Sequence, residues 1–259
     1  MKILFVGDIM GSAGRQVFLD KAIPMKRDRR VDMIIVNGEN AAAGKGITSK
    51  IAKEFLNAGA DVITLGDHTF DQREVMSYLN EESRIIRPAN FAPGTPGRGM
   101  VTVDTGAGKV NVVNLIGRVF LNPSDCPFRT VDKLLNQLPK NIPTFVDMHA
   151  EATSEKVAMG HHLAGRVTAV VGTHTHVQTS DERILAGHTA YLTDAGMTGS
   201  KDSVIGCEKE AVLKRFLTGL PARFEPAKGD VSLEGIIVTC ESHGGKATAV
   251  ERIRIQADG

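Results

Sequence analysis

The sequence is poor in aromatic side chains and has no excess of charge. It contains no tryptophan and two tyrosines. Proteins that bind single-stranded nucleic acid stack successive bases on several aromatic rings, so this composition disfavours a long nucleic-acid partner and leaves Phe70 and Phe91 as candidates for stacking one base. The chain has 31 lysines and arginines against 30 aspartates and glutamates, a formal net charge of +1. A dedicated polyanion binder would be much more basic.

Cysteines and long apolar runs are scarce as well. Cys126, Cys207 and Cys240 are odd in number and match neither a disulfide framework nor a zinc-binding spacing. No window approaches the run of about 18 apolar residues that a membrane span needs. The first apolar run, residues 2–6, ends at Gly7, which is too early for a signal peptide. The sequence therefore predicts a cytoplasmic protein with no membrane partner.

The sequence does contain a regular alternation of short β-branched runs with longer segments of helical period. This pattern is typical of βαβ units that build a largely parallel sheet. The expected strands are Ile3–Val6, Met33–Val36, Val62–Leu65, Pro143–Val146 and Thr168–Val171. The expected helices are Gly14–Lys26, Ser49–Ala58, Arg73–Asn80, Val131–Leu138 and Ser154–Leu163.

Two glycine-containing turns interrupt this alternation and predict antiparallel pairs. The pairs are Met100–Val103 with Val110–Ile116, and Gly235–Cys240 with Thr248–Ile255. They indicate an α/β fold with either one mixed sheet or two stacked sheets, and helices outside, in a single domain over residues 1–259. Residues 87–99 and 217–229 are rich in proline, glycine or both and are expected to form surface loops.

Polar side chains collect where the expected strands end. Because ligand sites of parallel sheets form beyond the carboxyl ends of the strands, these side chains are expected to share one edge. Carboxylates and imidazoles in this number favour divalent metal ions, with enough ligands for two of them. The segments at the strand ends are Gly7-Asp8, Asn37-Gly38-Glu39-Asn40, Gly66-Asp67-His68, Asp147-Met148-His149 and Gly172-Thr173-His174-Thr175-His176.

Each of these segments also has a simpler interpretation. Asp8 alone would usually cap a helix or a turn, and His149 alone would usually be a hydrogen-bonded core histidine. His174 and His176 are a stronger signal, because residues i and i+2 of an extended segment point to the same side. Asp147 would either orient a metal-binding imidazole or face away from the site. The coincidence at five strand ends favours the metal site.

The ordered motifs resemble those of the calcineurin-like metallophosphoesterases, and more closely their bacterial YmdB-type branch. Features typical of this branch are Met10, where many relatives carry a metal-binding histidine, and Glu39, where they carry aspartate. The resemblance runs from Met1 to about Ile255. It also includes the segments Gly172-Thr173-His174-Thr175-His176-Val177-Gln178-Thr179, Arg87-Pro88-Ala89-Asn90 and Tyr191-Leu192-Thr193-Asp194-Ala195-Gly196-Met197.

The resemblance implies a four-layer α/β/β/α sandwich with mixed sheets and a site for two metal ions. Iron is the leading metal, with manganese or zinc as alternatives. His68, which follows a metal ligand, would be the general acid of the reaction. Glu39 would bridge both ions; the remaining ligands would be Asp8, His176 and Asn40 on the first ion, and Asp67, His149 and His174 on the second.

One residue departs from the family pattern. The usual motif is Gly-Asn-His, whereas this chain has Gly66-Asp67-His68. An aspartate keeps an oxygen ligand but adds a negative charge, so three carboxylates rather than two would oppose the ions. We expect Asp67 to tighten metal retention or to favour a trivalent iron.

The resemblance implies hydrolysis of small cyclic nucleotides, 2′,3′-cyclic nucleotides above all. A hydroxide bridging the two ions would attack the phosphorus, and His68 would protonate the leaving oxygen. A phosphomonoesterase or an RNA-processing nuclease would use the same metals, with residues 87–99 among the loops that select the substrate. A metal-dependent nucleotide-sensing regulator with little turnover is the alternative of another class. The sequence does not identify the substrate-binding residues, and it leaves a homo-oligomer open.

The segment Ala41–Gly46 lies next to Glu39 and contains two of the chain's glycines. Its spacing does not match a Walker phosphate loop. It is either a plain mobile loop or a loop that offers backbone N–H groups or Lys45 to the substrate phosphate.

Overall fold

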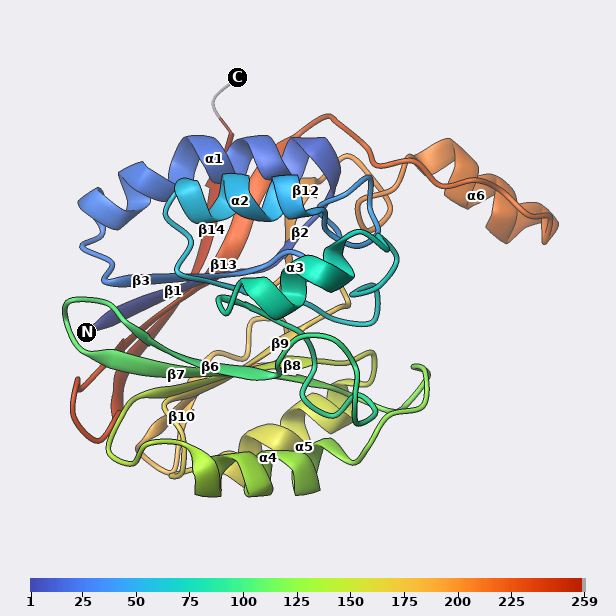
Figure 1. The fold of residues 1–259 in the computed structure, drawn as a ribbon. Helices are drawn as coiled ribbons and strands as arrows, with labels where there is room; N and C mark the ends of the chain where they lie inside the picture. Colours follow the sequence, from blue (N-terminus) through green and yellow to red (C-terminus); the bar gives the residue numbers. More distant parts are fainter. Residues whose placement is uncertain (258–259) are drawn as a thin grey trace.

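Two β-sheets stack face to face, and helices cover the outer side of each sheet (Figure 1). The structure is a computed structural model that describes residues 1–257. Three separate apolar cores lie between the successive layers. The predicted α/β/β/α sandwich with two mixed sheets is therefore confirmed.

The first sheet has the strand order β2-β12-β13-β1-β3-β4-β5, with β14 pairing to β13. Strands β1, β3, β4 and β5 run parallel, whereas β13 is antiparallel to β1, β12 and β14. The strands are β1 (Lys2–Val6), β2 (Asp8–Ile9), β3 (Met33–Asn37), β4 (Val62–Thr64), β5 (Ile85–Ile86), β12 (Met197–Ser200), β13 (Val231–Cys240) and β14 (Ala247–Gln256).

The second sheet has the order β10-β11-β9-β8-β7-β6, with parallel pairing from β7 to β11 and antiparallel strands at both edges. The predicted antiparallel pairs are confirmed as β6–β7 here and β13–β14 in the first sheet. The strands are β6 (Met100–Asp104), β7 (Lys109–Ile116), β8 (Thr144–His149), β9 (Ala169–Thr173), β10 (Arg183–Leu185) and β11 (Thr189–Leu192).

Helices α1 to α5 divide between the two outer faces, whereas α6 projects from the body of the molecule (Figure 1). Residues of α1, α2 and α3 belong to the core on the outside of the first sheet, and residues of α4 and α5 to the core outside the second. No helix within residues 1–257 is both long and apolar enough to cross a lipid bilayer. The helices are α1 (Gly11–Asp28), α2 (Ser49–Asn57), α3 (Val75–Glu81), α4 (Pro127–Gln137), α5 (Thr153–Leu163) and α6 (Lys209–Thr218).

The period-2 side-chain pattern of the strands builds the layers. In β1, Leu4 and Val6 pack toward the helices, whereas Ile3 and Phe5 pack into the core between the sheets. Phe5 stacks there on Phe145 of β8, with ring centroids 5.3 Å apart. Successive side chains of a strand point to opposite faces, so a continuously apolar strand is required where both faces are covered.

Several features differ from the prediction, among them the short strands β2 and β5, which were not expected; Asp8 lies in β2. Strand β8 extends to His149, so Asp147 and His149 lie inside the strand rather than after it. Residues 183–200 contain three short strands that were not expected. Helix α6 was also missed, and Leu217, predicted to begin a loop, lies in its last turn. This helix projects from the body of the molecule (Figure 1), and Phe216 on it is 82% exposed. Val212 is the buried residue of this helix, so the helix lacks the broad apolar face that makes a helix easy to recognise.

Candidate metal centre

The carboxyl ends of parallel strands from both sheets meet at one edge of the sandwich. Glu39 follows β3 and Asp67 follows β4 in the first sheet. His149 ends β8, and His174 follows β9 in the second sheet. Parallel strands carry their carboxyl ends to the same edge, so residues far apart in the chain converge there.

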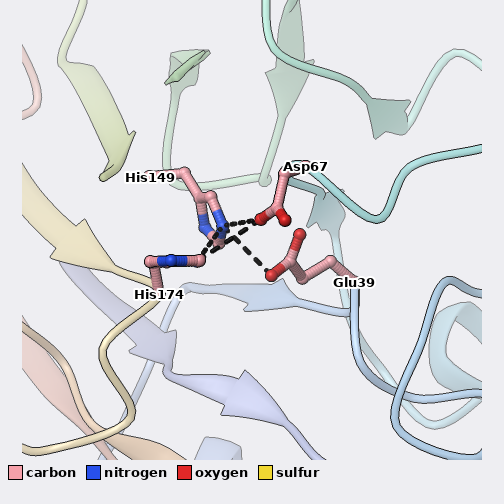
Figure 2. A group of neighbouring side chains, drawn as sticks. All are labelled: Glu39, Asp67, His149 and His174. Atoms are coloured by element: carbon pink, nitrogen blue, oxygen red, sulfur yellow. Dashed lines mark hydrogen bonds and ion pairs between the residues drawn. The ribbon is translucent and has the colours of Figure 1, made fainter. Parts of the chain in front are cut away.

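These four side chains point at one another (Figure 2). Their ligand atoms all lie within 4.8 Å of one another. His149 Nε2 is 3.0 Å from Glu39 Oε1 and 3.0 Å from Asp67 Oδ1. His174 Nδ1 is 3.0 Å from His149 Nε2 and 3.3 Å from Asp67 Oδ1. Two ring nitrogens and two carboxylate oxygens directed at one point form a donor set suited to a divalent metal ion.

The field inside this cluster favours a positive charge. Burial lowers the pKa of His149, but the carboxylates of Glu39 and Asp67 outweigh burial and raise it well above its usual value. The field that favours a proton on Nε2 also favours a metal cation beside it. A Cβ on Gly66 would lie 2.2 Å from Glu39 Oε2 and 2.4 Å from His149 Nε2, so the cluster leaves room only for glycine at that position.

Asp8, Asn40 and His176 lie next to this cluster. Asn40 Nδ2 donates to Glu39 Oε1 at 3.2 Å and to His176 Nε2 at 3.1 Å. Asp8 Oδ2 accepts a hydrogen bond from the His174 backbone at 3.1 Å, whereas its Oδ1 is buried without a partner. Burial raises the pKa of Asp8. An unpartnered buried carboxylate oxygen is costly, and a cation bound there would remove the cost.

A chain of hydrogen bonds behind the cluster fixes the ring of His149. Its Nδ1 donates to Thr173 Oγ1 at 2.9 Å, and the Thr173 hydroxyl donates to Asp147 Oδ1 at 2.7 Å. Asp147 Oδ2 accepts from Asn37 of β3 and Thr64 of β4, at 3.1 and 2.5 Å. Burial raises the pKa of Asp147 to about 6. Of its two predicted orientations, Asp147 therefore adopts the inward one and reaches the imidazole through Thr173.

His174 and His176 sit on a strained turn, with backbone φ angles of 96° and 63°. Side chains other than glycine rarely adopt such angles. Thr175 between them donates from its backbone at 3.2 Å and from its hydroxyl at 2.6 Å to Asp194 Oδ2. Lys156 of α5, which is completely buried, lies 2.6 Å from the same oxygen. This network holds the turn in its conformation.

Sequence reasoning missed the role of Lys156. A signal was present, because Lys156 lies three and seven residues before Met159 and Leu163, on the buried face of α5. Glu151 was also missed, although it follows His149 by two residues. Its Oε2 lies 3.1 Å from His174 Nε2, so a carboxylate stands beside the second ring nitrogen of His174 as well. The role of Asp194 was missed too, because this residue was recognised in the sequence only as part of the family-like segment 191–197.

His68 lies beside the cluster and not within it. Its backbone N–H donates to Glu39 Oε2 at 3.2 Å. Its ring places Nδ1 3.0 Å from Asp71 Oδ2 and Nε2 3.8 Å from Asp67 Oδ2. Asp71 was not predicted; its position three residues after His68 brings it back toward the ring.

A cavity of about 340 Å³ opens over the site. Lys45 and Glu151 line it together with ring and carboxylate groups of the cluster. Phe70 and Phe91, the predicted stacking candidates, are not among its walls, and pack on each other with centroids 5.9 Å apart. The lining residues are Met10, Glu39, Asn40, Ala43, Gly44, Lys45, His68, Glu151, His174, Thr175, His176, Ile205, Cys207, Phe224 and Pro226.

The segment 87–99 does not line this cavity either. Arg87 is nearly buried and donates to the backbone oxygens of Pro88, Thr95 and Pro96, at 2.8, 3.2 and 3.3 Å. These hydrogen bonds join residues within the segment 87–99. The role of this segment in substrate selection therefore stays a prediction, and no residue of the segment lines this cavity.

Comparisons with known proteins agree with this geometry. A family model described as YmdB-like protein matches residues 4–253. The 2′,3′-cyclic-nucleotide 2′-phosphodiesterase of Bacillus subtilis (strain 168) is 46% identical over 259 residues, which cover 100% of this chain and 98% of the relative. The crystal structure of a hypothetical protein from Thermus thermophilus has a TM-score of 0.94 and 40% identity over all of both chains.

A crystal structure of a novel phosphatase from Mycoplasma pneumoniae has a TM-score of 0.93 and 33% identity, over 99% of this chain and 93% of that one. The predicted family resemblance is confirmed over nearly the whole chain. The chain that carries this cluster at the edge of a four-layer sandwich therefore belongs to the YmdB-like protein family.

Proposed function

We propose that this chain hydrolyses 2′,3′-cyclic nucleotides with two bound metal ions. The observation that carries the proposal is the convergence of Glu39, Asp67, His149 and His174 within 4.8 Å, beside a cavity that Glu39 and His174 line. The prediction of a phosphoesterase is confirmed, because the chain belongs to a family whose relatives are named phosphodiesterase and phosphatase. The cyclic-nucleotide substrate is inferred from the Bacillus subtilis relative.

Two groups of side chains would hold the ions. Asp67, His149 and His174 would bind one ion, and Glu39 would contribute to both. The unpartnered Oδ1 of Asp8 supports the second position, which Asn40 and His176 would complete. The mixture of oxygen and nitrogen donors suits iron, with manganese or zinc as alternatives. When bound, two such ions polarise phosphoryl oxygens and lower the pKa of water.

His68 would deliver the proton to the leaving oxygen. His68 lines the cavity, and its Nδ1 lies 3.0 Å from Asp71 Oδ2. A hydrogen bond to Asp71 orients the ring, so that Nε2 is free to donate. A positioned proton donor contributes about 10²–10⁴-fold to the rate. Lys45, also in the cavity wall, would attract the anionic phosphate.

The test is hydrolysis of 2′,3′-cyclic AMP by the purified chain, with metal content measured on the same samples. We expect about two metals in the wild type, and a rate about 10²-fold lower or more in His68→Ala with unchanged metal content. Asp71→Asn should lower the rate less, and Glu39→Ala should lose metal. Loss of metal in His68→Ala would instead make His68 a ligand.

A substrate panel separates the remaining candidates. The Mycoplasma pneumoniae structure is described as that of a phosphatase, so phosphomonoesters belong in the panel beside cyclic and linear diesters. Faster hydrolysis of a monoester than of any diester would replace the proposed substrate. Metal bound without turnover of any panel member would favour a nucleotide-sensing regulator.

A further inference from the structure

The cavity over the metal-binding cluster has one apolar wall. Ile205, Cys207, Phe224 and Pro226 form this wall, and all four belong to residues 203–227, the segment that carries α6. The charged and imidazole groups of the cavity come from other segments. A ligand in this cavity therefore meets both ionic groups and an apolar surface, as is common in small-molecule sites.

The apolar wall is fixed relative to the metal-binding cluster. The two ends of the segment lie side by side. Glu208 N donates a hydrogen bond to Glu225 O, and Ala227 N donates one to Gly206 O, both at 2.9 Å. His176 Nδ1 donates to the backbone oxygen of Ile205 at 2.8 Å. A side chain expected to bind metal is thus hydrogen-bonded to the start of the apolar wall.

Phe224 is the flat surface in this wall. Of the phenylalanines and tyrosines within residues 1–257, it is the one that lines the cavity. The side chain is 37% exposed, and the guanidinium carbon of Arg215 lies 5.4 Å from the ring centroid. An aromatic ring at the edge of a pocket offers a π-face to any base, whatever its hydrogen-bonding groups.

We propose that Phe224 binds the nucleobase of the substrate by stacking, while the phosphate is held at the metal-binding end of the cavity. The proposal rests on the proposed function and adds the residue that separates nucleotides from other phosphoesters. Stacking depends little on base identity, so it predicts preference for nucleotides as a class without strong preference among bases. The cavity volume of about 340 Å³ is within the range of small-ligand sites.

The test compares two five-membered cyclic phosphodiesters, 2′,3′-cyclic AMP and glycerol 1,2-cyclic phosphate, which has no base. For Phe224→Ala we expect the KM for 2′,3′-cyclic AMP to rise about tenfold, with kcat and both constants for the glycerol ester nearly unchanged. Phe224→Tyr should restore the KM. Phe216→Ala is the matched control, because Phe216 lies on the same segment but outside the cavity wall.

Two results would overturn the stacking role. One is an unchanged KM for 2′,3′-cyclic AMP in Phe224→Ala. The other is an equal loss on both substrates, which would mean that Phe224 acts on the phosphate end or on folding.

Calorimetry with adenosine 3′-monophosphate and glycerol 2-phosphate keeps the stacking role separate from the proposed reaction. If the wild type hydrolyses neither cyclic ester, the proposed function fails. A selective loss of adenosine 3′-monophosphate affinity in Phe224→Ala would then still support stacking, and equal affinities in wild type and variant would overturn it.

Discussion

Lys156 Nζ lies 2.6 Å from Asp194 Oδ2, and both side chains are completely buried. The two residues are 38 positions apart in the chain. Lys156 also donates to the backbone oxygen of Thr173 at 2.9 Å, and Asp194 holds Thr175. The ion pair therefore sits directly beneath the turn that carries His174 and His176, and it links that turn to α5.

Replacement of Lys156 should destabilise the protein strongly. In Lys156→Met the Asp194 carboxylate stays buried without its cation, which costs about 3–5 kcal/mol of unfolding free energy. The double variant Lys156→Met with Asp194→Asn should recover part of this loss, because no charge is left buried. Urea unfolding measures both. Lys133→Met, at an exposed position on α4, is the control; if it costs as much as Lys156→Met, the burial argument fails.

The hydroxyl of Thr173 links Asp147 to His149 by hydrogen bonds, and we expect metal affinity to depend on it. Thr173→Val keeps the shape of the side chain but removes the acceptor for His149 Nδ1 and the donor to Asp147. Loss of such a partner behind a metal ligand weakens metal affinity by about 10–100-fold. Thr173→Ser should bind metal nearly as the wild type does. Metal affinity measured by chelator competition checks this, and wild-type affinity in Thr173→Val would contradict it.

Asp67 replaces the asparagine usual in the family pattern and should retain metal by its charge. It lies 3.0 Å from His149 Nε2 and 3.3 Å from His174 Nδ1. Asp67→Asn keeps the oxygen but removes one negative charge, so we expect affinity for metal to fall about tenfold, or ~1.4 kcal/mol. Asp202→Asn, which alters an exposed ion pair with Lys209, should change nothing. If Asp67→Asn and the wild type had equal metal content and equal rates, the charge of Asp67 would have no role in metal retention.

Ionisation of Tyr191 should destabilise the fold at alkaline pH. Burial raises its pKa to about 12, despite a hydrogen bond with Thr193. The usual tyrosine value is 10.0, so between these values the unfolded chain loses a proton that the native chain keeps. The free energy of unfolding must therefore fall as pH rises through this window.

Tyrosinate absorbance offers a direct measurement, because the chain has no tryptophan and only one other tyrosine, Tyr78. In Tyr78→Phe we expect a single transition near pH 12, and in Tyr191→Phe that transition should be absent. A transition of Tyr191 at the ordinary tyrosine value would show that its hydroxyl is accessible to water.

The sequence by itself determined most of the core strands and helices and the chemistry of the candidate site. Apolar residues recur every 2 positions in a half-buried strand and about every 3.6 positions in an amphipathic helix. Both patterns can be recognised within a few consecutive residues. Asp8, Glu39, Asp67, His149 and His174 could be predicted for the same reason, because each stands at or next to the end of a recognisable strand. Parallel pairing brings these ends to one edge within each sheet, and the stacking of the two sheets brings the two edges together.

Tertiary structure alone decided which distant residues complete the site. Asp194 supports the turn only because β11 pairs with β9, and Phe224 reaches the cavity because the segment around α6 folds back at Glu208 and Glu225. Phe70 and Phe91 were nearer in sequence to the predicted ligands, yet they pack on each other. Such contacts depend on packing between elements, and local propensity carries no information about them.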